Sequence, residues 1–238
     1  MSLESIEHAK NKAHESLSRN NAAFAAGEID EADWFLAGQV STAAYLAADN
    51  PRSQSGHSGD KAHWKHTRSL IGDAISRDGS FLDVGCASGH LMECMQQWLR
   101  EKSVDIEPYG LDIAPELADL ARRRLPHWTD RIHVGNALYW HPPLRFDFVR
   151  TGLEYVPPSR QRNFIQHLLT HVVTPGGRLI IGSYSEERDD TRPGASVEDD
   201  VRSWGFTVAG RTQRTHVHDE RVYRVLWIDR PVDSQLTP

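Results

Sequence analysis

The chain has 238 residues, of which 25% are charged and 39% hydrophobic, and its net charge is −6. This composition is typical of a globular protein of one or two domains. No apolar run approaches the roughly 20 residues of a membrane helix, and no signal peptide stands at the N-terminus, so we expect a cytoplasmic protein without a membrane partner. Two cysteines, Cys86 and Cys94, are too few for a disulfide framework. The acidic charge disfavours nucleic acid as a partner.

The first 60 residues are predicted to be mostly helical. An apolar stripe along residues 6–24 indicates a first helix, and a second is expected over about residues 30–48. The buried side of the second helix is expected to hold Trp34, Phe35, Val40 and Ala44. Residues 50–59 are rich in turn formers, which predicts a mobile loop. Asp60 can then cap a third helix.

From residue 80 onward, short apolar strands alternate with amphipathic helices. We expect strands at residues 81–84, 109–112, 131–134, 146–149, 178–182, 206–210 and 223–228. Helices are expected at residues 91–99, after Pro115, at 164–172 and at 196–204. This alternation predicts a doubly wound α/β fold with a seven-stranded, mostly parallel sheet, whose last two strands pair antiparallel. We divide the chain into a helical cap with its lid loop at residues 1–60, a main domain at 61–230 and a C-terminal tail at 231–238.

The strongest functional signal is the turn Asp83-Val84-Gly85-Cys86-Ala87-Ser88-Gly89, between the first predicted strand and a helix. Ligands of open parallel sheets bind beyond the carboxyl ends of the strands, where this turn would lie. Its small residues allow a ligand to approach the backbone closely. Two of the three glycines of a dinucleotide fingerprint are missing, which argues against an NAD-dependent oxidoreductase. An acid, Asp83, two residues before the first glycine suits a ligand that carries an amine.

Polar residues also follow the next two predicted strands. Asp112, at the end of the second strand, can accept both hydrogen bonds from a ribose diol. Asn136, after the third strand, carries a donor and an acceptor that can pair with the edge of an adenine, and Ala137 leaves room for the ring. The turn and these two positions predict an adenosyl ligand.

Together these residues resemble the class I S-adenosylmethionine-dependent methyltransferases over roughly residues 60–230. The likeness includes the Pro175-Gly176-Gly177 turn and the terminal strand pair. It implies a Rossmann-like methyltransferase fold and S-adenosyl-L-methionine as the cofactor, with S-adenosyl-L-homocysteine as the product. The cofactor-binding residues that it implies are Asp83, Gly85, Cys86, Ala87, Gly89, Asp112, Ile113, Asn136, Ala137 and Thr151. Two positions depart from the family's usual pattern: Ala87 replaces the middle glycine of the turn, and Asn136 stands where an aspartate is common.

By this likeness, Asp83 lies near the methionine amine, Asp112 binds the ribose and Asn136 the adenine. The reaction is displacement at a sulfonium methyl, so the protein's main tasks are alignment and exclusion of water. The sequence therefore gives only weak signals for catalytic residues. Two candidates are His57 in the loop at residues 50–59, as a general base or an acceptor-binding group, and Glu154 just beyond the fourth strand. For Glu154 the alternative is a solvated residue of the loop, and for His57, taken alone, a residue without a functional role is the favoured interpretation.

The expected acceptor is a small organic molecule, methylated at oxygen, nitrogen or carbon. The Asn/Asp-Pro-Pro-aromatic motif of amino-methylating nucleic-acid enzymes is absent after the fourth strand. No metal site is expected, because the histidine pairs at positions 63 and 66 and at 216 and 218 lack a clear third ligand. The helical cap would supply most of the acceptor pocket. The alternatives are a non-catalytic adenosyl-cofactor-binding protein and a methyltransferase that acts on a macromolecule.

Overall fold

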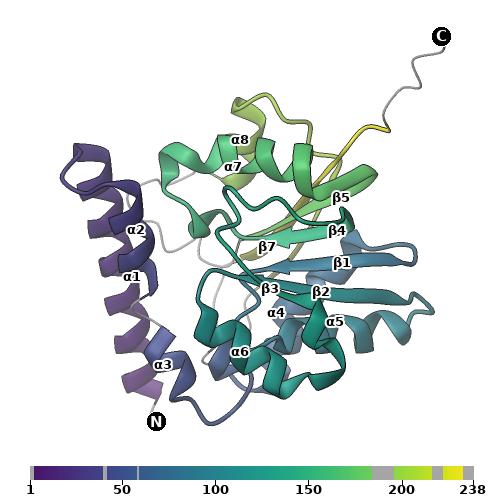
Figure 1. Ribbon diagram of the computed structural model, residues 1–238, viewed down its shortest axis with the longest axis horizontal. Helices are drawn as coiled ribbons and strands as arrows, with labels where there is room; N and C mark the ends of the chain where they lie inside the picture. The colour runs from purple at the N-terminus through teal and green to yellow at the C-terminus, as the bar shows by residue number, and fades with distance from the viewer. Residues whose placement is uncertain (1–2, 40–41, 58, 184–195, 216–221, 233–238) are drawn as a thin grey trace.

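The computed structural model describes residues 3–39, 42–57, 59–183, 196–215 and 222–232, with side chains from residue 15 onward. Its centre is one seven-stranded sheet in the order β3-β2-β1-β4-β5-β7-β6 (Figure 1). The strands are β1 (Gly79–Val84), β2 (Ile106–Asp112), β3 (Ile132–Val134), β4 (Phe146–Thr151), β5 (Val173–Ser183), β6 (Gly210–Thr215) and β7 (Val222–Asp229). The first five pair parallel, while β7 is antiparallel to both β5 and β6. The predicted doubly wound, mostly parallel sheet is confirmed.

Helices cover both faces of this sheet. The α-helices are α1 (Leu3–Ala26), α2 (Glu31–Gly38), α3 (Thr42–Leu46), α4 (Lys61–Arg68), α5 (His90–Arg100), α6 (Pro115–Arg124), α7 (Gln161–His167) and α8 (Val197–Ser203). Short helical turns complete the set: η2 (Ser53–Ser55), η3 (Ser69–Ala74), η4 (Pro126–Arg131), η5 (Leu153–Tyr155), η6 (Pro158–Arg160) and the π-helical η7 (Leu168–Val172). Figure 1 shows α7 and α8 above the sheet and α4, α5 and α6 below it.

Alternating side chains of the strands fill two cores. Leu82 of β1 packs with Phe164 of α7 on one face, whereas its neighbour Phe81 packs with Met95 of α5 on the other. Both faces are therefore apolar, as a parallel sheet with helices on each side requires. The winding direction changes between β1 and β4, and this switch point places a crevice at the carboxyl ends of those two strands.

The N-terminal segment differs from the predicted pair of long helices. The second predicted helix is broken into α2 and α3, because Gly38 ends α2. Trp34 is buried and donates through its ring nitrogen to Asn21 of α1, but Ala44 is exposed, so its expected burial is wrong. Val40 lies outside the described residues. Asp60 caps α4 as predicted, since its carboxylate accepts from the amide of His63.

Other boundaries also shift. The fifth strand begins at Val173 rather than at 178, so the turn predicted at residues 174–177 lies within β5. The sixth strand begins at Gly210 rather than at 206, because the amide of Phe206 still closes the end of α8 on Val201. The strand is polar and lies at the edge of the sheet, so no apolar run marks it. The helix predicted at residues 164–172 changes to π-helical geometry at Leu168. None of these differences affects the carboxyl ends of β1, β2 and β4.

The N-terminal segment lies at the carboxyl ends of the strands, at the left of Figure 1. Glu31 of α2 accepts from the hydroxyl of Tyr139 and, at 2.7 Å, from the side chain of Arg160, two residues in loops that follow β3 and β4. Tyr45 of α3 packs against a cluster of Ala87, in the turn after β1, with Ala114 and Leu117. Among the described residues, no helix is both long and apolar enough to cross a membrane.

Candidate functional site

The turn after β1 is shaped by backbone that favours glycine. The amides of Gly85 and Cys86 both donate to the carbonyl of Leu111 on β2, at 2.7 and 3.1 Å. Gly85 and Gly89 have φ values of 72° and 73°, and Ala87 has a φ of 45°. The left-handed region costs a residue with a Cβ roughly 1–2 kcal/mol. Ala87 therefore stores strain at the centre of the turn, where a glycine would not.

Asp112 is locked beside this turn at the end of β2. One carboxylate oxygen accepts from the amide of Ala87 at 2.8 Å, and the other accepts from the amide of Ala114 at 2.9 Å. Burial raises the pKa of Asp112, and the hydrogen bonds from the amides act in the opposite direction. Since each carboxylate oxygen can accept a second hydrogen bond, the fixed carboxylate can still bind a pair of hydroxyls.

Asn136 follows β3 and is half-buried. Its side-chain oxygen accepts from the amide of Leu138 at 3.0 Å, which fixes the orientation of the side chain. Ala137 packs against the core beside Trp140. The predicted adenine position is thus a short turn with a fixed amide and a small residue next to it.

Asp83 lies at the base of the crevice and pairs with Arg150, which was not predicted as a site residue. A guanidinium nitrogen of Arg150 lies 3.1 Å from the Asp83 carboxylate, and the two residues face each other across β1 and β4. Their side chains are only 1% and 6% exposed. Burial raises the pKa of Asp83 to about 6, although Arg150 lowers it. The sequence does offer one indication of Arg150, because it is a charged residue near the end of the mostly apolar strand β4.

Tyr155, at the end of η5, completes this cluster. Its hydroxyl lies 3.1 Å from the same nitrogen of Arg150. Its ring covers Gly85 so closely that a Cβ at that glycine would come within 2.8 Å of the ring carbon Cζ. Burial raises the pKa of Tyr155 above its usual value. The first glycine of the turn thus has an aromatic ring directly against it.

Several solved structures share this fold. The structure resembles the N-methyltransferase NodS from Bradyrhizobium japonicum WM9 in complex with S-adenosyl-L-homocysteine, with 19% identity, coverage of 80% of this chain and 97% of that chain, and a TM-score of 0.57. It also resembles a SAM-dependent methyltransferase from Aquifex aeolicus, with 17% identity, coverage of 77% and 100%, and a TM-score of 0.52. These likenesses establish the fold.

A third structural neighbour is 1,6-didemethyltoxoflavin-N1-methyltransferase from Burkholderia thailandensis, with 17% identity, coverage of 72% of this chain and 80% of that chain, and a TM-score of 0.51. A search of curated protein sequences gives no match. The sequence itself matches the family model of a methyltransferase domain over residues 81–177. Residues 81–177 therefore form a methyltransferase domain, and the fold around them is that of the class I S-adenosylmethionine-dependent methyltransferases. Its cofactor is S-adenosyl-L-methionine, which leaves as S-adenosyl-L-homocysteine.

The donor groups of the methyltransferase domain fit this cofactor. As the resemblance implies, Asp112 would offer carboxylate oxygens to the ribose and Asn136 would meet the adenine, while the ring of Tyr155 lies against Gly85 in this structure. The remaining predicted residues lie at the same carboxyl ends: Cys86 is buried, Ile113 is half-buried, and Thr151 is buried with its hydroxyl donating to the carbonyl of Gly152. Burial raises the pKa of the Cys86 thiol. A buried, neutral thiol in the turn serves packing.

The two catalytic candidates occupy different places in the methyltransferase. His57 is 8% exposed, and its ring packs on those of His63 and Trp64, with centroids 4.9 and 5.2 Å away. The side chain of Glu154 is exposed and folds back against Gly152. His57 thus belongs to an aromatic cluster on α4, and Glu154 to the rim of the crevice.

The loop at residues 50–59 docks on the glycine-rich turn. Ser88 of the turn donates to the carbonyl of Pro51 at 2.9 Å, and its hydroxyl lies 2.8 Å from that of Ser55. Within the loop, Asn50 accepts from the amide of Ser53 at 3.0 Å and so starts η2. The loop that was predicted to be mobile thus has hydrogen-bonded structure of its own.

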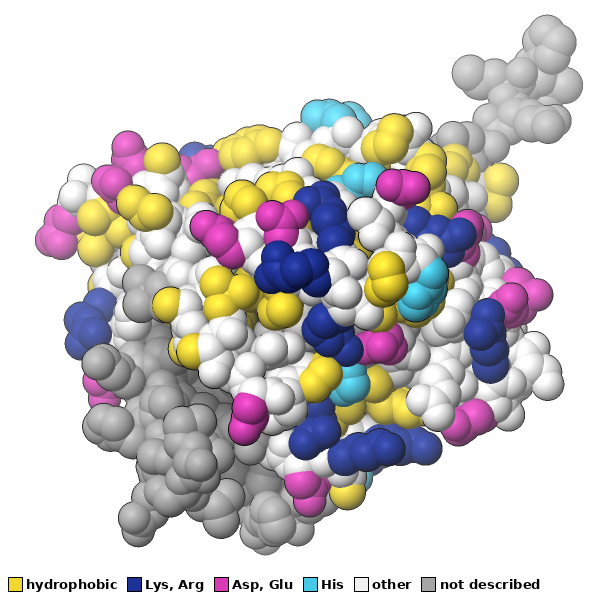
Figure 2. Space-filling view, turned by 60° about the horizontal axis from the view of Figure 1, so that its bottom comes forward, with side chains coloured by type: hydrophobic (Ala, Val, Ile, Leu, Met, Phe, Trp, Pro, Cys, Tyr) yellow, Lys and Arg dark blue, Asp and Glu magenta, His cyan; other side chains and the backbone are white. Residues whose placement is uncertain are grey.

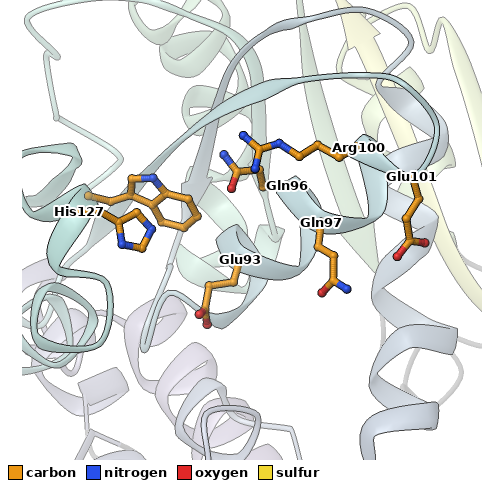
Figure 3. A pocket seen from close by; sticks show the side chains of 7 residues that line it. Glu93, Gln96, Gln97, Arg100, Glu101 and His127 are labelled. Atoms are coloured by element: carbon orange, nitrogen blue, oxygen red, sulfur yellow. The ribbon is translucent and has the colours of Figure 1, made fainter.

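A groove of about 530 Å³ lies elsewhere on the methyltransferase, between α5 and η4 (Figure 3). It is lined by Glu93, Gln96, Gln97, Arg100, Glu101, His127 and Trp128. None of the residues predicted for the cofactor lines it. Within the part of the chain that the structure describes, no group of three His, Cys, Asp or Glu residues could hold a metal ion. The histidines at positions 216 and 218 lie outside that part.

Proposed function

We propose that the chain transfers the methyl group of S-adenosyl-L-methionine to a small organic acceptor in the cytoplasm. The observation that carries this proposal is the position of the N-terminal segment, in which Ser55 contacts Ser88 of the turn and Tyr45 packs against the cluster of Ala87, Ala114 and Leu117. A segment that covers the turn would enclose a small acceptor, as ligand pockets do, and would obstruct an extended polymer. On the face shown in Figure 2, basic side chains run down the middle with acidic ones beside them, and the net charge of −6 disfavours a nucleic-acid partner.

One structural neighbour supports a small acceptor. The Burkholderia structure contains 1,6-didemethyltoxoflavin together with S-adenosylhomocysteine. The residues before 61 would form the cap over the cofactor and line the acceptor pocket. The aromatic rings of Trp34, Phe35 and Tyr45 belong to this segment. Apolar and aromatic walls are typical of pockets that bind small ligands.

The residues of this chain would act mainly by positioning. The cofactor supplies the activated methyl group, and the protein aligns an acceptor atom behind it and excludes water. Asp112 and Asn136 would hold the adenosine, and the strained turn at Ala87 would support its sulfur end. Alignment of this kind contributes roughly 7–11 kcal/mol toward lowering a reaction barrier. The reaction therefore does not require a strong general base.

His57 and Glu154 remain our candidates for contact with the acceptor. Glu154 lies at the rim beyond β4, where an exposed carboxylate can accept a proton from the acceptor or orient an amine. His57 is packed on Trp64 at 5.2 Å, so it would have to rotate out of the aromatic cluster to act as a base. We propose that Glu154 contacts the acceptor from the rim of the crevice and that His57 contacts it from the cap.

The test is a panel of small amines, phenols and carboxylic acids assayed with methyl-labelled cofactor. Formation of S-adenosyl-L-homocysteine that depends on one acceptor, with label recovered in that acceptor, supports the proposal. Cofactor binding without acceptor-dependent turnover would instead indicate a non-catalytic adenosyl-binding protein. Label transferred only to protein or nucleic acid from a lysate would indicate a macromolecular acceptor.

A further inference from the structure

We propose that Glu31 is a positioning residue, which couples the helical cap to the bound cofactor by way of Tyr139 and Arg160. Through Tyr139 it links α2 to the turn that we assign to the adenine, and through Arg160 it links α2 to the segment that follows β4. The inference rests on the proposed function, in which the residues before 61 cap the cofactor. It gives this cap a specific attachment whose strength depends on the cofactor.

Glu31 is the first residue of α2, where an acidic side chain often serves only to favour the helix dipole. In this chain the main domain engages both of its carboxylate oxygens. One oxygen accepts from the hydroxyl of Tyr139, and the other accepts from Nε of Arg160 at 2.7 Å. The side chain of Glu31 is only 22% exposed. Asp33, a second acid in the same helical turn, is exposed and provides a comparison at the same helix end.

Tyr139 belongs to the same short turn as Asn136. Its amide donates to the carbonyl of Asn136 at 3.0 Å, and the side-chain oxygen of Asn136 accepts from the amide of Leu138 at 3.0 Å. Tyr139 is 57% exposed, so its hydrogen bond to Glu31 fixes the side chain more than packing does. The same hydrogen bond raises the pKa of Tyr139, which keeps its hydroxyl protonated as a donor. A ligand that fixes Asn136 therefore also fixes a partner of Glu31.

Arg160 lies at the end of η6, directly before α7. Its amide donates to the carbonyl of Pro157 at 2.8 Å, so the backbone that carries the guanidinium is held in a tight turn. The segment between β4 and this turn includes Glu154, our candidate for contact with the acceptor. Glu31 thus joins α2 to two loops, of which one is assigned to the adenine and the other to the acceptor.

These contacts serve orientation more than stability. An ion pair between partly exposed side chains contributes little to the free energy of folding, because water competes for both partners. Trp34 of α2 is buried and donates to Asn21 of α1 at 3.0 Å, and Phe35 packs on the main core. Loss of Glu31 should therefore leave α2 attached but free its orientation relative to the two loops.

Such a link between α2 and the cofactor works in both directions. If a cofactor that fixes the turn at Asn136 also fixes α2, then a fixed α2 strengthens cofactor binding by the same factor. A residue that only stabilises the cap would instead change the mobility of α2 equally with and without the cofactor. The ratio of the mobilities in these two states therefore distinguishes coupling from simple support.

The experiment measures amide hydrogen exchange of α2 in the full chain, with and without S-adenosyl-L-homocysteine. In the wild type, we expect the ligand to slow this exchange by about fivefold or more, the lower range of such couplings. In Glu31→Ala and in Tyr139→Phe the slowing should be lost, and calorimetry should show that the ligand binds more weakly by about the same factor. Asp33→Ala is the matched control, which should keep both the slowing and the affinity of the wild type. Tyr139→Phe removes a single exposed hydroxyl, so it tests the coupling even if Glu31→Ala does not fold.

Equal slowing in the wild type and in both variants would overturn the inference, as would wild-type exchange in α2 that ignores the bound ligand. Loss of the slowing in Asp33→Ala as well would also overturn it, because the effect would then not be specific to Glu31. A wild-type chain that does not bind S-adenosyl-L-homocysteine would overturn it together with the cofactor assignment. Intact coupling in a chain that methylates only a macromolecule would support the inference and contradict the proposed acceptor.

Discussion

The main-chain amide of Ala87 donates a 2.8 Å hydrogen bond to the carboxylate of Asp112, so the glycine-rich turn and the end of β2 form one rigid unit. Asp112 therefore holds the turn, and we propose that it also binds the ribose. Removing its side chain should affect both the cofactor and the fold.

For Asp112→Ala, we expect binding of S-adenosyl-L-homocysteine to weaken by about 2–4 kcal/mol, because two charge-assisted hydrogen bonds to the ribose are lost. The measurement is calorimetry on a variant whose fold is checked by circular dichroism. Asp112→Asn keeps the acceptor for the Ala87 amide and serves as the milder comparison. An unchanged dissociation constant in folded Asp112→Ala would contradict the assignment of the ribose.

The strain at Ala87 gives a second prediction. Since Ala87 has a φ of 45°, Ala87→Gly should relieve the left-handed strain of roughly 1–2 kcal/mol. The greater freedom of glycine in the unfolded chain offsets part of this gain. We expect urea denaturation to show a net gain in the free energy of unfolding of about 0.5–1 kcal/mol. Ala137→Gly, where no positive φ occurs, should instead lower the stability.

Asn136 provides the third prediction. Its side-chain oxygen fixes the turn by accepting from the amide of Leu138. Asn136→Asp keeps this acceptor and one toward the adenine amino group, so cofactor affinity should change little. Asn136→Leu loses both and should bind clearly less well. Equal affinities for the Leu variant and the wild type would show that the adenine is bound elsewhere.

A local sequence pattern indicates each of the site positions that we predicted from the sequence. The turn follows an apolar strand, and Asp112 and Asn136 stand where such strands end. Strand ends of a parallel sheet gather at one edge, so the order of elements alone predicted their proximity. The structure places all three at that edge.

Arg150 could not be found in this way. Its pairing with Asp83 depends on β4 lying next to β1, although 67 residues separate the two in the chain. No local pattern encodes that neighbour. The break between α2 and α3 was missed although its cause is local, since Gly38 ends α2. The late start of β6 was missed because that strand is polar and Phe206, where we expected it to begin, still closes the end of α8.

The pKa of Asp83 gives a fourth prediction. Burial raises it to about 6, and only the ionised carboxylate can bind an ammonium. As the pH falls through 6, Asp83 takes up a proton, and the affinity for S-adenosyl-L-homocysteine should fall about tenfold for each further pH unit. Above pH 7 the affinity should be flat. The affinity for 5′-methylthioadenosine, which has no ammonium, should not follow this curve, and calorimetry from pH 5 to 8 measures both.

The last prediction concerns the loop at residues 50–59 and His57. The hydroxyl of Ser55 lies 2.8 Å from that of Ser88 in the cofactor turn, so a cofactor that orders the turn should also hold the loop. Trypsin cleavage after Arg52 should slow in the presence of S-adenosyl-L-homocysteine, while cleavage after the exposed Lys102 serves as the reference. Once an acceptor is known, His57→Ala should lower turnover and leave cofactor affinity nearly intact. The control is His127→Ala, on the distant groove of Figure 3. Cleavage after Arg52 that ignores the cofactor would count against the lid, and full turnover in His57→Ala would remove that histidine from the reaction.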